Sequence, residues 1–182
     1  MAEYGILAHE RQAVHALLAD LADEQSEVAE IRREAMTQSS ETWHDNAPAD
    51  AAMHESGRIA ESAKNLQKLL EKKTEPYPDE ASTAIQLGSF AIVSIWGTTV
   101  GAAIVGVPQA YKEEDFEAVA QELDETIITS PEAPLGAALW GLTQDTAGQY
   151  SLEGGRSFDF TVLGVDQEVI RRLFVEAPVT TD

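Results

Sequence analysis

The sequence predicts an α+β protein in which an antiparallel pair of long helices precedes a small, mostly antiparallel sheet domain. Three observations support this class: heptad-spaced apolar residues in two N-terminal segments, a proline pair at Pro76 and Pro78, and a strand-like pattern after that pair. The 182 residues suffice for one or two domains. We expect a helical hairpin over residues 1–75, a linker over 76–82, a sheet domain over 83–166, and a short helix and tail over 167–182.

The two helical segments run from about Ala8 to Gln38 and from about Asp50 to Lys73. In the first, apolar residues recur in steps of three and four, as in a coiled-coil seam, with Glu10 and Glu24 as polar exceptions. This seam comprises Leu7, Val14, Leu17, Leu21, Val28, Ile31 and Ala35. In the second, one heptad position is shared by Ala52, Ile59, Leu66 and Lys73.

The segment between the helices, Ser39 to Pro48, interrupts the heptad pattern with serines, an asparagine and a proline. Such residues favour a turn that brings the second helix back along the first. The alternative is a coiled-coil spacer or dimerisation helix, which predicts a stable dimer through residues 8–73. An intramolecular hairpin predicts a monomer, and this is our expectation.

After the linker, short elements of both kinds are predicted. Strands are expected over 89–96 and 99–107, around a Gly97-Thr98-Thr99 turn, and another begins at Ile127. Residues 113–123 have the pattern of an acidic amphipathic helix with Phe116, Val119, Ala120 and Leu123 on one face. The remaining expected elements are one or two helical turns over Pro134–Trp140 ended by Gly141, a hairpin of 149–152 with 157–165, and a helix over 166–174 capped by Asp166.

The charge balance restricts the possible partners. The chain has 12 Lys and Arg against 32 Asp and Glu, a formal net charge of −20. Residues 1–75 have 15 acids and 8 bases, and residues 76–182 have 17 acids and 4 bases. Tight sequence-independent nucleic-acid binding needs basic residues, so this balance argues against it and favours basic partner surfaces. An acidic, salt-adapted proteome is the alternative explanation.

Other classes of function are also restricted. Without cysteine, the chain has no disulfide, thiolate zinc site or catalytic thiol. The uncharged segment Ala84–Tyr111 is long enough to cross a bilayer, but its glycines and β-branched residues favour two buried strands. We therefore expect no membrane partner. The first residues include acids and a histidine and have no apolar stretch, so we expect no signal peptide.

Five short motifs, taken in order and spacing, resemble the bacterial Gre transcript-cleavage factors (GreA/GreB) over roughly residues 5–165. At the apex, Asp45-Asn46-Ala47 is similar to the family's Glu-Asn-Ala. The other four motifs are Leu87-Gly88-Ser89, Ile104-Val105-Gly106, the signature-like segment Pro134-Leu135-Gly136-Ala137-Ala138-Leu139-Trp140-Gly141, and the closing hairpin Gly154–Val162.

The resemblance implies an FKBP-like C-terminal domain that docks on bacterial RNA polymerase at its secondary channel, here through Pro134, Leu135 and Gly136. The hairpin then enters the channel and brings its tip to the polymerase active site. Carboxylates at the tip help to hold the second catalytic Mg²⁺, and the polymerase hydrolyses the backtracked RNA. The resemblance thus implies a cytoplasmic factor that is not itself an enzyme.

The metal in this scheme is the polymerase's own. A lone carboxylate at a solvated tip is a poor Mg²⁺ site without ligands and phosphates from a partner, so we expect the isolated chain to bind no cofactor. Arg32 and Arg33, about two turns below the tip, match basic residues that contact the RNA 3′ end in the family. Their alternative role is that of a solvated helix face.

At the tip this sequence departs from the family pattern of two acids spaced as Asp-x-x-Glu. With Asp45 at the second position, the first falls on Thr42, and Glu41 lies one residue earlier. Asp45 and Glu41 are therefore the candidate catalytic and metal-binding carboxylates. Replacing one acid by a hydroxyl leaves two functions open: stimulation of cleavage, or channel binding without cleavage that inhibits transcription.

Each tip residue also has a structural explanation. Asp45 and Asn46 are residue types that cap a helix N-terminus. Trp43 either packs across the turn or contacts RNA, and His44 is either a proton donor or simply solvated. An FKBP-like domain also raises the possibility of a prolyl isomerase, but the sequence has no obvious aromatic-lined pocket.

Overall fold

The computed structural model describes residues 4–38, 47–121 and 123–176. The chain divides into two compact units. One comprises residues 12–71, and the other comprises residues 1–11 together with residues 72–182. We call them the hairpin unit and the sheet unit. The architecture is α+β, as predicted.

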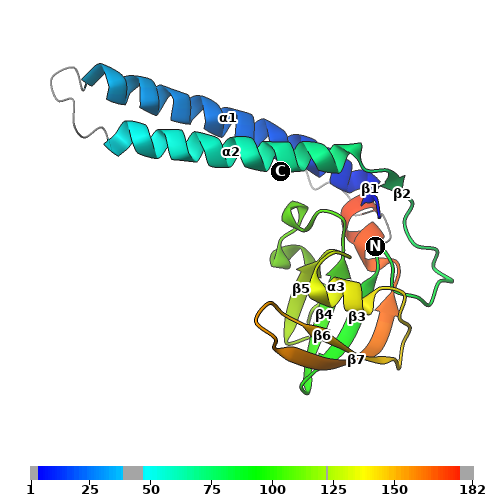
Figure 1. Cartoon of the computed structure of the whole chain (residues 1–182). Helices are drawn as coiled ribbons and strands as arrows, with labels where there is room; N and C mark the ends of the chain where they lie inside the picture. Colours follow the sequence, from blue (N-terminus) through cyan, green and yellow to red (C-terminus); the bar gives the residue numbers. More distant parts are fainter. Residues whose placement is uncertain (1–3, 39–46, 122, 177–182) are drawn as a thin grey trace. The chain divides into compact units, whose positions relative to one another are not determined.

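The hairpin unit consists of the long helices α1 (Ala8–Gln38) and α2 (Ala47–Glu71), which run side by side (Figure 1). The bounds predicted for the first helix are confirmed. The second helix begins at Ala47 rather than Asp50, because Pro48 lies in its first turn, where a missing N–H and a fixed φ are both tolerated. The predicted apex is therefore shorter, since Ala47 and Pro48 belong to the helix.

The two helices of the hairpin unit share a small apolar seam. Val28, Ala52 and Ile59 are buried in it, and Leu21 packs against them. Glu24, a polar exception in the pattern, is ion-paired with the Arg58 guanidinium at 3.3 Å. Next to this seam, Gln25 Nε2 donates a hydrogen bond to Ser56 Oγ at 2.7 Å. Polar side chains such as Glu24 and Gln25 are therefore tolerated at the edge of the seam because each pairs with a side chain of α2.

The first residues of the chain belong to the sheet unit. Strand β1 (Ile6–Leu7) pairs in parallel with β2 (Thr74–Glu75), and Ile6 N–H donates to the Lys73 carbonyl at 2.9 Å. A Cβ at Gly5 would lie 2.1 Å from that carbonyl oxygen, so only glycine fits there. This pairing joins residues almost 70 positions apart, and no local pattern in the sequence predicted it.

The main sheet has five strands in the order β5-β4-β3-β7-β6. Its antiparallel pairs are β3 with β4, β3 with β7, and β6 with β7. The strands are β3 (Phe90–Ile95), β4 (Thr98–Ile104), β5 (Glu125–Thr129), β6 (Ala147–Ser151) and β7 (Ser157–Asp166). The pairing of β4 with β5 is parallel, so the sheet is mixed rather than wholly antiparallel.

Each face of the sheet has its own core. Helix α3 (Pro134–Leu139) covers one face (Figure 1). Its Leu135 and Leu139 belong to the same core cluster as Val93 and Val162. On the other face, Phe90 packs with residues from segment 108–123 and from the C-terminal helical turns. These turns are α4 (Val169–Arg171) and the π-helical η3 (Arg172–Glu176), and the short 3₁₀ helices are η1 (Pro108–Ala110) and η2 (Glu113–Phe116).

Three local predictions for the sheet unit need correction or refinement. The turn between β3 and β4 is Trp96-Gly97, because Ile95 pairs directly with Thr98. The acidic segment 113–123 begins with a 3₁₀ helix followed by turns, and Phe116 is the one completely buried residue among those of the segment that the structure describes. The helix predicted over 166–174 begins later, but Asp166 Oδ1 does accept the Glu168 and Val169 N–H groups, at 2.8 and 3.2 Å.

Candidate functional site

The predicted tip residues lie outside the described residues. They are Glu41, Thr42, Trp43, His44, Asp45 and Asn46. The helices on either side are described: α1 ends at Gln38 and α2 begins at Ala47. The assignments of Asp45 and Glu41 to a metal site and of Asn46 to a helix cap therefore stay predictions.

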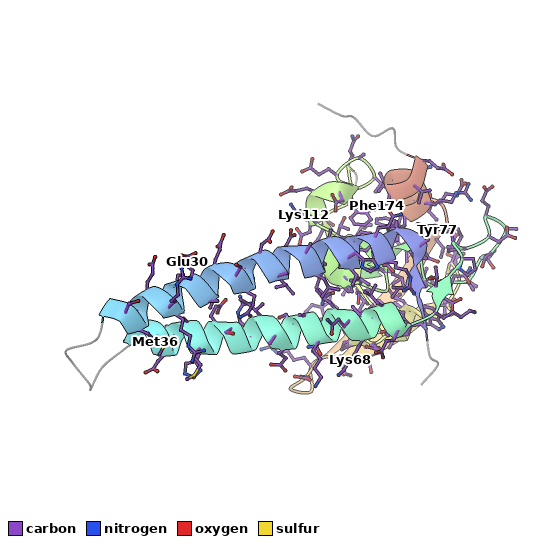
Figure 2. All side chains as sticks on the ribbon, turned by 90° about the horizontal axis from the view of Figure 1, so that it is seen from above. Glu30, Met36, Lys68, Tyr77, Lys112 and Phe174 are labelled. Atoms are coloured by element: carbon purple, nitrogen blue, oxygen red, sulfur yellow. The ribbon has the colours of Figure 1, made fainter. Side chains whose placement is uncertain are left out.

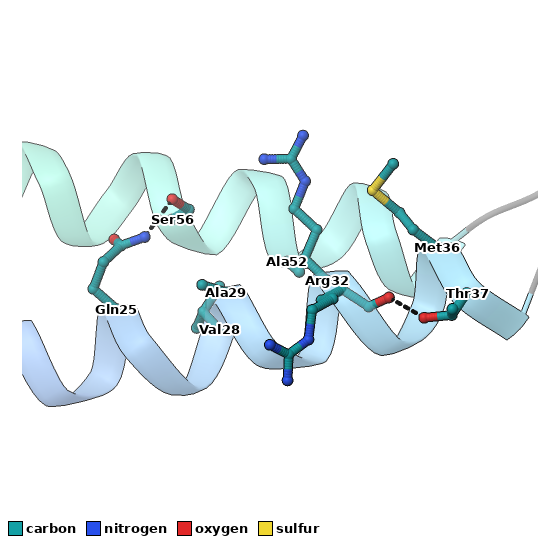
Figure 3. Close-up of a pocket in the computed structure, with 9 residues that line it drawn as sticks. Gln25, Val28, Ala29, Arg32, Met36, Thr37, Ala52 and Ser56 are labelled. Atoms are coloured by element: carbon teal, nitrogen blue, oxygen red, sulfur yellow. Dashed lines mark hydrogen bonds between the residues drawn. The ribbon is translucent and has the colours of Figure 1, made fainter.

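A groove lies between α1 and α2 in the part of the hairpin that borders the tip (Figure 3). Its volume is about 520 Å³, and its lining combines apolar and basic side chains. Arg32 and Arg33 both line it. Arg33 is ion-paired with Glu30 at 2.7 Å, whereas no ion pair of Arg32 is found within the described ranges. The groove residues are Gln25, Val28, Ala29, Arg32, Arg33, Met36, Thr37, Ala52 and Ser56.

Apolar side chains near the same end of the hairpin unit are exposed. Ile31, a predicted seam residue, is 52% exposed, and Met36 and Met53 are 61% and 50% exposed (Figure 2 labels Met36). The buried seam therefore ends near Val28 and Ala52, before it reaches Ile31. Of these three exposed residues, Met36 lines the groove together with Arg32 and Arg33, so an exposed apolar side chain there accompanies two basic ones.

In the sheet unit, the signature-like segment forms helix α3. Pro134 occupies its first turn, and Gly141, with φ of +79°, follows its end. Pro134 is exposed, but Leu135 is 6% exposed and Gly136 is buried. A Cβ at Gly136 would lie 2.0 Å from the Ser130 carbonyl oxygen. Of the three predicted docking residues, only Pro134 presents a surface, while Leu135 and Gly136 hold the helix in place.

Trp140, which follows the last residue of α3, does not belong to the core. It is 36% exposed and lines a cleft of about 490 Å³ within the sheet unit, together with Tyr4, Pro76 and Tyr77. The polar lining groups of this cleft are Glu75, Asp79 and Gln86. The cleft is thus lined both by the linker prolines and by Trp140 at the end of α3, next to the predicted docking segment.

A buried polar network at the start of α1 was not predicted from the sequence. Glu10 has no exposed surface. Its Oε2 accepts the Leu7 N–H at 2.7 Å, and its Oε1 accepts the N–H groups of Gly106 and Val107 at 2.8 and 3.2 Å. The Tyr111 hydroxyl also donates to Oε1, at 2.9 Å. One carboxylate thus connects the first turn of α1 to the loop after β4.

The proton positions around Glu10 follow from its acceptor role. Because the Tyr111 hydroxyl donates to Glu10, it accepts from His9 Nε2, at 2.6 Å. The other ring nitrogen, Nδ1, then accepts from the Tyr77 hydroxyl. His9 also stacks on the rings of Tyr77 and Phe174, with centroids 5.7 and 5.4 Å apart. His9 is therefore neutral in this arrangement.

The electrostatics of this network agree with a neutral histidine. Burial lowers the pKa of His9 to about 4. Burial, followed by the nearby charge of Glu10, raises the pKa of Tyr77 to about 12, and the same causes raise the pKa of Tyr111 further. Burial raises the pKa of Glu10, and its four hydrogen bonds oppose that rise.

The sequence contains part of a motif that could have indicated the role of Glu10 at the start of α1. Glu10 is the third residue of α1, and it bonds back to the N–H of Leu7, the residue before the helix, as in half of a capping box. The usual Ser or Thr at the first position would have indicated the motif, but here that position is Leu7. The other backbone groups that bond to Glu10, those of Gly106 and Val107, are almost 100 residues away in the sequence, so no local pattern could predict them.

Across the described ranges, no group of three or more His, Asp or Glu side chains is arranged to hold a metal ion. The same residues include no helix that is long and apolar enough to span a membrane.

Comparison of the sequence with protein-family models and with curated proteins finds no match. Solved structures do show similarity. The GreA factor homolog 1 (Gfh1) of Thermus thermophilus is 19% identical with a TM-score of 0.38, covering 90% of this chain and 99% of that chain. The Gfh1 of Thermus aquaticus is 20% identical with a TM-score of 0.39, covering 91% and 99%.

A third similar structure is the transcription elongation factor GreA/GreB from Nitrosomonas europaea, 20% identical with a TM-score of 0.34. It covers 58% of this chain and 79% of that chain. Similarity of this extent concerns the fold alone. What the present chain does has to be inferred from its own residues.

Proposed function

We propose that this chain is a Gre-type transcription factor that acts on RNA polymerase through the secondary channel. The observation that carries the proposal is the sequence arrangement Asp45-Asn46-Ala47 at the turn between two long helices, followed by the Pro134–Gly141 segment in a sheet domain. The sheet unit, FKBP-like in the proposal, docks on the polymerase. The hairpin unit carries the tip into the channel.

The proposed role of the tip is to complete a metal site that belongs to the polymerase. Asp45, with Glu41 as the second candidate, supplies hard oxygen ligands to Mg²⁺ and helps to orient a water for attack on the backtracked RNA. The polymerase contributes the remaining ligands, and the chain alone has no nuclease activity. Arg32 and Arg33 line a groove below the tip, where cationic side chains attract RNA phosphates.

A second candidate function is supported by one residue. Thr42 stands where the first acid of the Asp-x-x-Glu pattern is expected, so the tip lacks one charged ligand at that place. A factor that enters the channel but does not promote cleavage would inhibit transcription instead. Both functions share the partner and the docking mode, and they differ in the outcome at the active site.

Backtracked elongation complexes with the cognate polymerase distinguish these functions. If the chain stimulates cleavage, Asp45→Asn abolishes the shortened RNA products while binding to the polymerase persists. Asp20→Asn, the same charge change on an exposed part of α1, leaves cleavage intact. If the chain is a non-cleaving binder, the parent chain yields no products but slows nucleotide addition, and Thr42→Asp introduces cleavage. Absence of binding, cleavage and inhibition would refute the proposal.

A further inference from the structure

Trp96 occupies a position in the sheet unit that a tryptophan rarely takes. It is the first residue of the two-residue turn between β3 and β4, with φ of +53°, and Gly97 follows with φ of +83°. Positive φ at both positions defines a turn that favours Asn-Gly, and a bulky residue there is strained. Trp96 is also 73% exposed. Neither the turn nor the core explains a tryptophan at this site.

The indole of Trp96 begins a row of stacked rings. It stacks on Phe158 with centroids 4.7 Å apart, and Phe158 stacks on Tyr150 with centroids 5.1 Å apart. Tyr150 and Phe158 are paired residues of β6 and β7, so the row runs from the β3–β4 turn across two strands. We call these three residues the aromatic row. It ends in solvent at the exposed indole.

A carboxylate lies on the same face of the sheet. Tyr150 packs on the core that α3 covers, and so does Ile127 on β5. Glu125 is two residues before Ile127 on that strand, so its side chain projects from the same face. Glu125 pairs with Val100 on β4, four residues after Trp96, so its carboxylate lies at the end of the sheet that bears the β3–β4 turn. The charge of Glu125 also contributes, after burial, to the raised pKa of Tyr150. No ion pair of Glu125 is found among the residues described.

An exposed indole face near a carboxylate without an ion pair is complementary to an organic cation. A guanidinium stacks on an indole face and forms paired hydrogen bonds with a carboxylate. Residues 76–182 contain 17 acids and 4 bases, which repel the phosphates of a nucleic acid. Tryptophan, tyrosine and arginine are also the residues that dominate the binding energy of protein interfaces.

We propose that the aromatic row and Glu125 form a docking site for an arginine-bearing segment of a partner protein. The inference is independent of the tip chemistry, since it uses no residue of the hairpin unit. The arginine side chain lies against the indole of Trp96 and directs its guanidinium toward Glu125.

The test is an NMR titration of the full-length chain with an acetylated, amidated tetra-arginine peptide. The matched probe is the same peptide with citrulline in place of arginine, which retains shape and hydrogen-bonding capacity but has no charge. The expected result is a saturable shift of the Trp96 indole N–H signal with tetra-arginine only. No shift at Trp96, or equal shifts with both peptides, would overturn the proposal.

Three variants localise the effect. Trp96→Asn creates the favoured Asn-Gly turn and therefore keeps the hairpin, and it should weaken peptide binding at least tenfold as read from the Phe158 and Tyr150 amide signals. Glu125→Gln should weaken binding about threefold to tenfold, in proportion to one lost charge-assisted contact. Asp159→Asn removes the same charge from the opposite face of β7 and should change binding less than about twofold, since alternate residues of a strand face opposite sides.

Two outcomes of the variant series count against the site. If Asp159→Asn weakens binding as much as Glu125→Gln, the peptide responds only to net charge. If a single-stranded hexathymidylate shifts the Trp96 signal at the same concentration as tetra-arginine, the aromatic row is a nucleobase platform. Either result overturns the proposal of an arginine-bearing partner.

Discussion

Replacing Glu10 by alanine is expected to destabilise the sheet unit severely. The carboxylate is fully buried and accepts three backbone N–H groups and the Tyr111 hydroxyl. In Glu10→Ala all four donors lose their acceptor in a site without solvent access. Each buried orphan donor costs about 1–3 kcal/mol, and partial entry of water reduces the sum, so the expected loss is about 3–5 kcal/mol.

Glu10→Gln separates the contacts of the two oxygens. An amide that keeps its oxygen at the position of Oε1 retains the bonds from Gly106, Val107 and Tyr111. Its NH₂ group then faces the Leu7 N–H, so one buried donor is opposed by another donor. The expected cost is about 1–2 kcal/mol, well below that of the alanine variant.

Urea unfolding followed by tryptophan fluorescence measures these costs in a Trp43→Phe background, where the remaining tryptophans, Trp96 and Trp140, both belong to the sheet unit. Glu34→Ala, an exposed glutamate on α1, is the control and should stay within about 0.5 kcal/mol of the parent. A loss below about 1 kcal/mol for Glu10→Ala would refute the reasoning, because orphaned buried donors cannot be that inexpensive.

The remaining predictions concern pH, seam packing and glycines. The folded-state pKa of His9, about 4, lies below the ordinary 6.5, so the unfolded chain binds the proton first and stability falls as pH drops from 6.5 toward 4. After a reduction for partial exposure, His9 should contribute about 2 kcal/mol to this loss. Urea unfolding at pH 7 and at pH 4 measures the loss, and the His9 contribution should be present in the parent chain and absent in His9→Gln. Ile59→Ala at the buried seam should lower the free energy of unfolding by about 2–4 kcal/mol, measured by thermal unfolding followed by circular dichroism. Ile31→Ala, at a 52% exposed position, should lower it by less than about 0.5 kcal/mol. Equal losses would contradict a buried seam that ends before Ile31. Gly136→Ala should lower the free energy of unfolding by about 3 kcal/mol, because its Cβ would lie 2.0 Å from the Ser130 carbonyl oxygen. Gly57→Ala, with open space around the added Cβ, should instead stabilise α2 by about 0.5–1 kcal/mol, so a stabilising Gly136→Ala would show that the close approach is absent.

Much of the hairpin unit was predictable because its signals are local. Apolar residues at steps of three and four indicated α1, whose bounds agree with the prediction. In the sheet unit, Pro134 and Gly141 likewise marked the two ends of α3. The seam was predicted to continue to Ile31, which is exposed. Spacing alone indicates which residues share a helix face, and the partner helix decides how much of that face is buried.

The candidate site was predicted less completely. The sequence placed Arg32 and Arg33 on one stretch of helix, and the structure adds the groove that they line. It also predicted a docking segment, and of the three residues named for it only Pro134 is exposed in the structure. The structure also places Trp140 in a cleft with Pro76 and Pro78, which no local pattern in the sequence indicated.

By itself, the sequence determined the order of the elements, the long helices and the acidic residues between them, since periodicity, breakers and charge act over a few neighbouring residues. The tertiary structure alone decided the parallel pairing of β4 with β5, the burial of Glu10 and the stacking of Trp96 on Phe158. These features depend on groups that are far apart in the chain and meet only when the sheet unit has folded. A buried carboxylate or an exposed tryptophan therefore acquires its role from its distant partners.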